Sequence, residues 1–313
     1  MRPRLHGGTD AQGAARWDFS SNANACGPCP VALRLVQAAD AGRYPDPGYT
    51  GLREALARLH AVRPSRLLLA GSASECIQRL TAWRWRAGDR HFWTPPHAYG
   101  DYAHAASAWG LERAQQPEHA QLAWLCDPGS PLGQAASGQH VRALLDGVRR
   151  TVVLDRAYAP LRLLGEGALS ETELDSVWQL WSPNKALGLT GVRAAYAIAP
   201  PDAEADVSSL DGFAASWPIG AHGEAMLVAW TQPDVQAWLA RSRETLRLWA
   251  EALRLVVGRP GLDMRPATRP TCARNLHAPW MAMPFARRAS SCEMPARLVC
   301  RAGGASMHRG LRL

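Results

Sequence analysis

The sequence predicts an α/β fold in which a mainly parallel sheet is covered by helices on both of its faces. Three features of the 313 residues lead to this prediction. Short apolar runs recur along the chain, segments with helical spacing separate them, and most runs end in polar or turn-forming residues. Because ligands bind at the carboxyl ends of the strands in such sheets, we expect the functional site there.

The chain begins with a segment that predicts no regular sheet. Residues 1–35 are rich in Gly, Asn, Ser and Pro, which indicates an irregular arm, and a short helix is predicted over 30–39. The sequence YPDPG at 44–48 is turn chemistry. Leucines at helical spacing then predict a helix over 52–59.

The alternating part of the chain starts at residue 67 and carries the sheet. Short apolar runs predict strands over 67–70, 91–93, 122–125, 151–154, 177–180 and 194–198. Helices are predicted from the 71–74 turn to residue 83, over 103–109 and over 140–148.

The character of the sequence changes after about residue 205. Two helices are predicted over 220–230 and 234–257, followed by a Pro- and Arg-rich tail with weaker strand signals. We therefore expect a large domain over 36–205 and a smaller α+β domain over 206–313, which the arm of residues 1–35 joins.

Composition excludes several classes of protein. Apolar residues make up 47% and charged residues 20% of the chain, values typical of a packed protein rather than a disordered one. No run of apolar residues is long enough to span a membrane, and the N-terminus lacks the apolar core of a signal peptide. The seven scattered cysteines are interpreted as reduced thiols of a cytoplasmic protein. Cys26 and Cys29 form a single CxxC pair, so no metal site is predicted.

The basic residues hold the most informative signal. They exceed the acidic residues by 8, but they are dispersed, so we expect no nucleic-acid partner. All 35 are arginine except Lys185. The guanidinium of arginine stays protonated, whereas a desolvated lysine can lose its proton and attack a carbonyl carbon. Lys185 is therefore a candidate chemical residue, although the count alone leaves chance survival of an exposed lysine equally open.

Polar side chains follow four of the predicted strands. They are Ser72 and Ser74 after the first, Tyr99 after the second, Asp155 with Tyr158 after the fourth, and Lys185 between Ser182 and Arg193 after the fifth. The serines open a helix and suit a phosphate, although a plain helix cap is the alternative. Together these groups would serve a planar cofactor with an aldehyde, a ring nitrogen, a phenolic oxygen and a phosphate, which is pyridoxal 5′-phosphate.

Three motifs carry a resemblance to a known family. The segment SPNKALGLTGVR at 182–193 resembles the lysine motif of class I and II aminotransferases, and DRAY at 155–158 resembles their Asp-Glu-Ala-Tyr. The segment YPDP at 44–47 resembles the motif that sends a tyrosine to the phosphate of the neighbouring subunit. The resemblance implies the fold-type I pyridoxal-phosphate architecture, and a homodimer whose site lies at the subunit boundary.

The resemblance also implies a role for each motif residue. Lys185 would bind the cofactor covalently and move protons at the substrate Cα, Asp155 would pair with the ring nitrogen, and Tyr158 would contact the phenolic oxygen. Tyr99 would stack on the ring, and the phosphate would be held by Ser72, Ala73, Ser74, Ser182, Arg193 and the partner's Tyr44. Ser130 stands where the family has an asparagine that contacts the phenolic oxygen. Substrate-binding residues would be His6, Asn22, Arg301 and Arg312.

The arm narrows the expected reaction. HGG at 6–8 and DFSSNAN at 18–24 resemble the threonine-phosphate decarboxylases of cobalamin biosynthesis. The resemblance implies decarboxylation of O-phospho-L-threonine to (R)-1-amino-2-propanol phosphate. An aminotransferase of the histidinol-phosphate type is the first alternative. A non-catalytic relative is the second, because Ser130 and Arg156 depart from the family pattern and the stretch between Arg301 and Arg312 is short.

Overall fold

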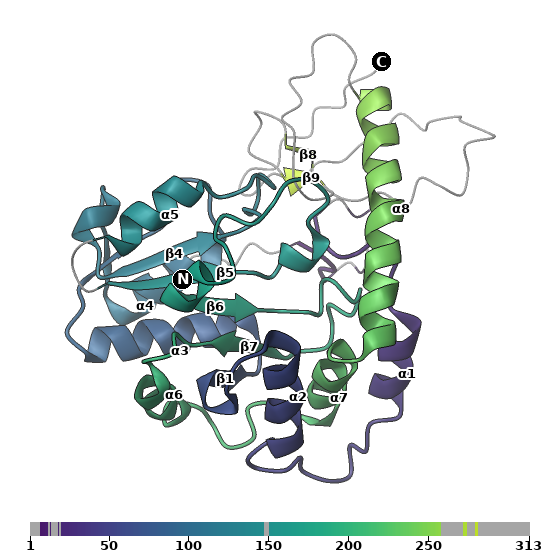
Figure 1. Ribbon diagram of the computed structural model, residues 1–313, viewed down its shortest axis with the longest axis horizontal. Helices are drawn as coiled ribbons and strands as arrows, with labels where there is room; N and C mark the ends of the chain where they lie inside the picture. The colour runs from purple at the N-terminus through teal and green to yellow at the C-terminus, as the bar shows by residue number, and fades with distance from the viewer. Residues whose placement is uncertain are drawn as a thin grey trace.

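A seven-stranded sheet forms the centre of the protein in the computed structural model (Figure 1). The structure describes residues 7–11, 13, 18, 20–146, 150–257, 272–273 and 279–280. The strand order is β1-β7-β6-β5-β4-β2-β3. The strands are β1 (Leu67–Ala70), β2 (His91–Trp93), β3 (Glu112–Arg113), β4 (Leu122–Cys126), β5 (Thr151–Asp155), β6 (Trp178–Trp181) and β7 (Ala195–Ile198).

The mainly parallel sheet that the sequence predicts is confirmed. Strands β2 to β6 run parallel to one another, and only β7 is antiparallel to its two neighbours, β6 and β1. A loop over 182–194, with no crossover helix, joins β6 to β7, so the chain returns beside β6 in the opposite direction. This loop carries Lys185.

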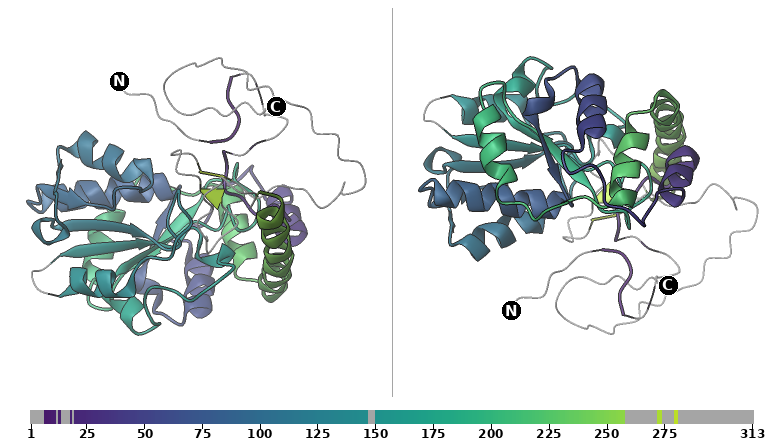
Figure 2. Two further views of the ribbon diagram at one scale, coloured as in Figure 1. Left: turned by 90° about the horizontal axis from the view of Figure 1, so that it is seen from above. Right: turned by 90° about the horizontal axis from the view of Figure 1, so that it is seen from below.

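Helices cover both faces of the sheet (Figure 2). One face packs against α3 (Ala73–Arg86), α4 (Gly100–Trp109) and α6 (Glu204–Asp211). The other packs against α5 (Gly138–Leu145), α2 (Thr50–His60) and α7 (Ala221–Trp230), with α1 (Pro30–Gln37) and α8 (Pro233–Val257) outside them. Among the described residues, no helix is both long enough and apolar enough to cross a membrane.

Alternation along each strand divides the core between the two faces. In β4, Leu122 and Trp124 belong to the cluster under α3 and α4, whereas Ala123 and Leu125 belong to the cluster under α5. All of these side chains are buried, which is why the strand reads as a continuous apolar run. The six predicted strands lie within one residue of observed strands for the same reason.

Among the described residues, one strand of the main sheet and one α-helix have no counterpart in the sequence prediction. Strand β3 consists of two exposed, charged residues that pair only with β2 at the sheet edge, so no apolar pattern marks it. Helix α6 buries only Val207 and Leu210 in an otherwise polar segment. The described part of the smaller region also contains a short antiparallel pair, β8 (Cys272–Ala273) and β9 (Pro279–Trp280).

Candidate active site

Lys185 lies in the loop that follows β6, at the carboxyl end of that strand. Its side chain is half-buried, and its ammonium nitrogen is 5.4 Å from the centroid of the Tyr158 ring. Tyr158 follows the neighbouring strand β5. Parallel pairing of β5 with β6 therefore brings two of the predicted site residues together from distant parts of the sequence.

The N-terminal arm is attached directly to the lysine loop. The backbone N–H of Asn24 donates to the Lys185 carbonyl at 2.9 Å, and the buried Asn24 amide donates to the Ala186 carbonyl (3.0 Å) and the Ser242 hydroxyl (2.9 Å). Asn24 thus joins the arm, the lysine loop and α8. A Cβ on Gly27 would lie 2.8 Å from the Cα of Gly188, so this contact requires glycine.

Asp155 occupies the end of β5 and is held in one orientation. It is 4% exposed, and its two carboxylate oxygens accept hydrogen bonds from the Tyr102 hydroxyl (2.6 Å) and the Ala157 N–H (2.9 Å). Burial, together with the Asp155 charge, raises the pKa of Tyr102 well above its usual value, so the phenol keeps the proton that it donates.

Sequence reasoning missed Tyr102. Its ring is fully buried and stacks on Trp124, with centroids 5.0 Å apart and planes 10° apart. The signal that could have found it is its place one helical turn after Tyr99, on the side of α4 that faces the sheet. A tyrosine there looks like an ordinary core residue until β5 is placed beside it.

The turn between β1 and α3 leaves two backbone amides free. Ser72 is the N-cap of α3, since its hydroxyl accepts from the Glu75 N–H at 3.1 Å. In the described part of the chain, no acceptor is found for the N–H groups of Ala73 and Ser74. Both groups lie in the first turn of a fourteen-residue helix, where the dipole favours an anion. The cap and phosphate interpretations of this turn are therefore compatible.

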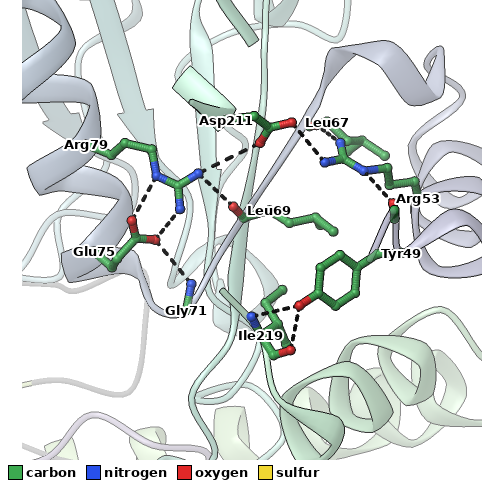
Figure 3. Close-up of polar contacts among 10 residues, drawn as sticks. Tyr49, Arg53, Leu67, Leu69, Gly71, Glu75, Arg79, Asp211 and Ile219 are labelled. Atoms are coloured by element: carbon green, nitrogen blue, oxygen red, sulfur yellow. Dashed lines mark hydrogen bonds and ion pairs between the residues drawn. The ribbon is translucent and has the colours of Figure 1, made fainter. Parts of the chain in front are cut away.

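An ion pair between buried Arg79 and half-exposed Glu75 fixes the shape of this turn (Figure 3). The Arg79 side chain is 2% exposed and binds the Glu75 carboxylate through two hydrogen bonds of 2.8 and 2.6 Å. The same guanidinium donates to the Leu69 carbonyl at 3.1 Å, and Glu75 accepts from the Gly71 N–H at 3.2 Å. Both ends of the turn are thereby bound to one Arg–Glu pair, which also offsets the negative charge of Glu75.

The ion-pair network continues to α2 and α6. Asp211 on α6 lies 3.2 Å from the Arg53 guanidinium and 3.9 Å from that of Arg79 (Figure 3). Beside it, the Tyr49 hydroxyl donates to the Ile219 carbonyl at 2.7 Å and accepts from its N–H at 3.1 Å. These contacts hold the segment that follows Tyr44 against the segment that leads into α7.

Tyr99 lies between the α3 turn and Asp155. Its hydroxyl donates to the Asp101 carboxylate at 2.8 Å, and that carboxylate also accepts a short hydrogen bond from the Ser74 hydroxyl. The Tyr99 ring meets the Tyr102 ring edge-on, with centroids 5.7 Å apart. A continuous line of contacts therefore runs from Ser74 through Tyr99 and Tyr102 to Asp155.

The remaining predicted phosphate ligands differ in exposure. Ser182 is buried and donates to Asn184 at 2.9 Å. Arg193 is exposed, and its guanidinium makes no hydrogen bond or ion pair with any described residue. Tyr44 is 77% exposed, and its ring stacks on that of Trp217 with centroids 4.3 Å apart. Ser130 is half-buried in the loop after β4.

The substrate-binding predictions can be placed only in part. Asn22 belongs to the arm, and its amide oxygen is buried with no hydrogen-bond donor among the described residues. A buried carbonyl oxygen without a donor is costly, so it suits a ligand group. His6, Arg301 and Arg312 lie outside the described residues.

Local contacts hold Asp127, which precedes Ser130, and Arg156, which departs from the family pattern. Asp127, three residues before Ser130, is 3% exposed and pairs with Arg162 at 2.7 Å, while it accepts from two backbone N–H groups. Arg156 lies over the Trp181 ring at 4.7 Å, and burial lowers the pKa of its guanidinium. No group of three or more His, Cys, Asp or Glu is placed to hold a metal ion in the part of the chain that the structure describes.

Comparisons with known proteins show a family and a shared fold. The family model for aminotransferase class I and II matches residues 105–270. A histidinol-phosphate aminotransferase of Ruegeria pomeroyi is 28% identical over 266 residues, covering 77% of this chain and 72% of the relative. The chain spans only 59–60% of the length of the next two curated relatives.

Two solved structures share the fold. The histidinol-phosphate aminotransferase of Sinorhizobium meliloti, in complex with pyridoxal-5′-phosphate, has a TM-score of 0.71 and 19% identity, covering 81% of this chain and 74% of that one. The L-threonine-O-3-phosphate decarboxylase of Porphyromonas gingivalis has a TM-score of 0.64 and 19% identity, covering 77% of this chain and 76% of that one.

Proposed function

Because the chain belongs to the aminotransferase class I and II family, we propose that it is an enzyme that uses pyridoxal 5′-phosphate to act on a phosphorylated amino-acid-like substrate. The residues present fit this cofactor. A buried carboxylate, Asp155, is oriented by two donors, and two free amides open α3. The half-buried amine of Lys185 lies beside the ring of Tyr158.

The bound cofactor supplies an electron sink for the pair of electrons left when a bond at the substrate Cα breaks. Asp155 holds the proton on the ring nitrogen, since an oriented carboxylate stabilises a cation beside it. The Lys185 amine binds the cofactor and then carries a proton to or from Cα. The ring of Tyr158 lies 5.4 Å from that amine, and its hydroxyl is assigned to the phenolic oxygen of the cofactor.

The phosphate is assigned to the amides of Ala73 and Ser74, with Ser182 and Arg193 from the same chain. The amides lie at a helix N-terminus and lack an acceptor, and the Arg193 guanidinium has none among the described residues. Tyr44 of a second copy completes the site in a homodimer, which the exposure of this tyrosine supports. The enzyme is assigned to the cytoplasm, in keeping with the free thiols of its described cysteines.

The reaction we assign is decarboxylation of O-phospho-L-threonine to (R)-1-amino-2-propanol phosphate, a step of cobalamin biosynthesis. The observation that carries it is the hydrogen bond from the Asn24 N–H to the Lys185 carbonyl, because it attaches the decarboxylase-like arm to the loop that carries the reacting amine. The unpaired oxygen of Asn22 in the same arm supports a polar substrate there.

Histidinol-phosphate transamination is the second candidate, and the relative from Ruegeria pomeroyi favours it. Both reactions would need the same cofactor contacts and would differ in which bond at the substrate Cα breaks. A non-catalytic relative is the third candidate, favoured by Ser130 and Arg156, although the contacts of Lys185 and Asp155 argue against it.

One assay separates the three candidates. The cofactor-loaded protein is incubated with O-phospho-L-threonine, and released carbon dioxide and the amine product are measured. A parallel reaction contains histidinol phosphate and 2-oxoglutarate, and glutamate is measured. We expect carbon dioxide from the first mixture and no glutamate from the second. Glutamate alone would establish the transaminase, and no product from either would favour the non-catalytic relative.

A further inference from the structure

Ser74 and Tyr99 share one acceptor, and this arrangement bears on how the cofactor site is built. The same oxygen of Asp101 accepts from both hydroxyls, and the two hydroxyl oxygens are 3.3 Å apart. Asp101 is 7% exposed. It lies in the first turn of α4, where the helix dipole favours a carboxylate.

Each hydroxyl has one proton, and both protons are directed at Asp101. Burial raises the pKa of Tyr99, so its phenol stays protonated and remains a donor. The Ser74 hydroxyl cannot donate to Asp101 and to a phosphate at the same time, and the charged Asp101 carboxylate holds this proton more strongly than the neutral Asn184 oxygen holds that of Ser182. Its oxygen offers a phosphate only lone pairs, which repel an anion. The backbone N–H of the same residue has no such conflict, because it is free of any acceptor among the described residues.

This geometry separates the backbone and the side chain of Ser74 into two roles. We propose that Asp101 is a positioning residue that locks Ser74 and Tyr99 into one unit, so that the Ser74 side chain supports the ring-stacking tyrosine instead of binding the phosphate. The inference rests on the proposed cofactor. The ring end depends on the Ser74 hydroxyl, and the phosphate end depends on backbone amides with Ser182 and Arg193.

The side-chain contacts of Tyr99 fix the position of its ring. Tyr99 is only half-buried and precedes α4 as its N-cap residue, so backbone contacts alone do not fix its ring. The bond to Asp101 and the edge-on contact with Tyr102 hold the ring from two sides. Ser74 connects this unit to α3, so the stacking tyrosine is fixed relative to the turn whose amides are free.

Two probes distinguish the roles of Ser74. Pyridoxal 5′-phosphate carries ring and phosphate, whereas 5′-deoxypyridoxal carries the ring and aldehyde without the phosphate. Dissociation constants for both are measured by titration of the full chain, and the visible circular dichroism of the bound ring reports its stacking. We expect Ser74→Ala to lower the affinity for both probes by the same factor, about five-fold, and to change the circular dichroism of the bound ring.

Three further variants complete the design. Tyr99→Phe keeps the ring but loses the hydroxyl, and we expect its effect to be non-additive with that of Ser74→Ala. In an Asp101→Ala background, Ser74→Ala should have no further effect on either probe. Asp234→Asn is the matched control, because Asp234 also lies in the first turn of a helix but is exposed, and both affinities should stay unchanged.

The outcomes are separable. If Ser74→Ala lowers the affinity for pyridoxal 5′-phosphate but leaves that for 5′-deoxypyridoxal unchanged, Ser74 is a phosphate ligand and the inference is overturned. That pattern is the one expected of Ser182→Ala and Arg193→Met. If the unsubstituted protein binds neither probe, the proposed function itself fails. If the Ser74→Ala variant does not fold, Tyr99→Phe gives the same test. Equal losses of affinity for both probes would support the inference, and a loss for pyridoxal 5′-phosphate alone would overturn it.

Discussion

His60 is expected to set an acid limit on the stability of the fold. Its ring nitrogen lies 2.7 Å from the Tyr196 hydroxyl, and its ring packs against Trp181 with centroids 4.8 Å apart. Burial, with a smaller contribution from the nearby Arg156 charge, lowers the pKa of His60 from 6.5 to about 4. The folded protein therefore keeps His60 neutral over a pH range in which the unfolded chain takes up a proton.

The sign of the pH effect follows from proton binding. Because the folded pKa is lowered, the contribution of His60 is fully present above pH 6.5 and is lost as the pH falls towards 4. The loss amounts to about 3 kcal/mol in the free energy of unfolding. Urea unfolding between pH 7 and 4 checks it. His60→Gln should flatten the pH dependence, whereas His119→Gln, which replaces an exposed histidine, should keep it. Equal slopes in all three proteins would refute the assignment.

The residues of the candidate site differ in how far sequence reveals them. Lys185 is conspicuous because every other basic residue is arginine, and Asp155 and Tyr99 follow apolar runs that end abruptly. Tyr102 and Asp101 carry no such signal, since a tyrosine and an aspartate in a first helical turn are ordinary. Their roles come from contacts with Asp155 and Ser74, which are distant in sequence. Proximity of that kind depends on which strands are neighbours.

At the scale of elements, the apolar strands were predictable, including β1 at one sheet edge, whereas the exposed edge strand β3 was not. Strands buried on both faces must be apolar throughout, so each leaves a run in the sequence. An edge strand such as β3 needs only backbone pairing and leaves none. The antiparallel direction of β7 also escaped prediction, because it depends on the loop over 182–194 containing no crossover helix.

Two Arg–Glu pairs with the same spacing provide an element-scale prediction. Glu75 and Arg79 lie on α3 and Glu54 and Arg58 on α2, each pair four residues apart. The Arg79 side chain is 2% exposed and bonds the β1–α3 turn, whereas that of Arg58 is 72% exposed. We expect Arg79→Met to lower the free energy of unfolding by about 2 kcal/mol, since it leaves the Leu69 carbonyl and the half-exposed Glu75 carboxylate without their partner. Arg58→Met should cost about 0.5 kcal/mol or less.

Chemical denaturation of the two variants shows whether the loss of stability comes from the contacts of Arg79 at the β1–α3 turn or from the loss of any helical Arg–Glu pair. Similar losses in the free energy of unfolding from both substitutions would mean that the Arg79–Glu75 pair does not hold the turn. Loss of cofactor affinity in Arg79→Met without loss of stability would place the effect on the free amides of Ala73 and Ser74 alone.

At the scale of the whole molecule, the fold and the location of the site follow from the alternating pattern, because that pattern sends the ends of the parallel strands to one edge. The choice between decarboxylase and transaminase does not follow, since both align the same residues and differ in substrate orientation. The domain boundary near residue 205 and the roles of His6, Arg301 and Arg312 stay predictions, and these three residues lie outside the described part of the chain.

The central claim is that Lys185 binds the cofactor, and the composition makes its test unusually direct. Lys185 is the sole lysine in the 313 residues, so Lys185→Arg gives a lysine-free chain of the same charge. Both proteins are incubated with pyridoxal 5′-phosphate and reduced with borohydride, and their masses are determined by mass spectrometry. We predict one covalently bound cofactor per chain in the unsubstituted protein, located on the peptide that contains Lys185, and none in Lys185→Arg. An unlabelled unsubstituted protein, or a label that persists in the variant, would contradict the account.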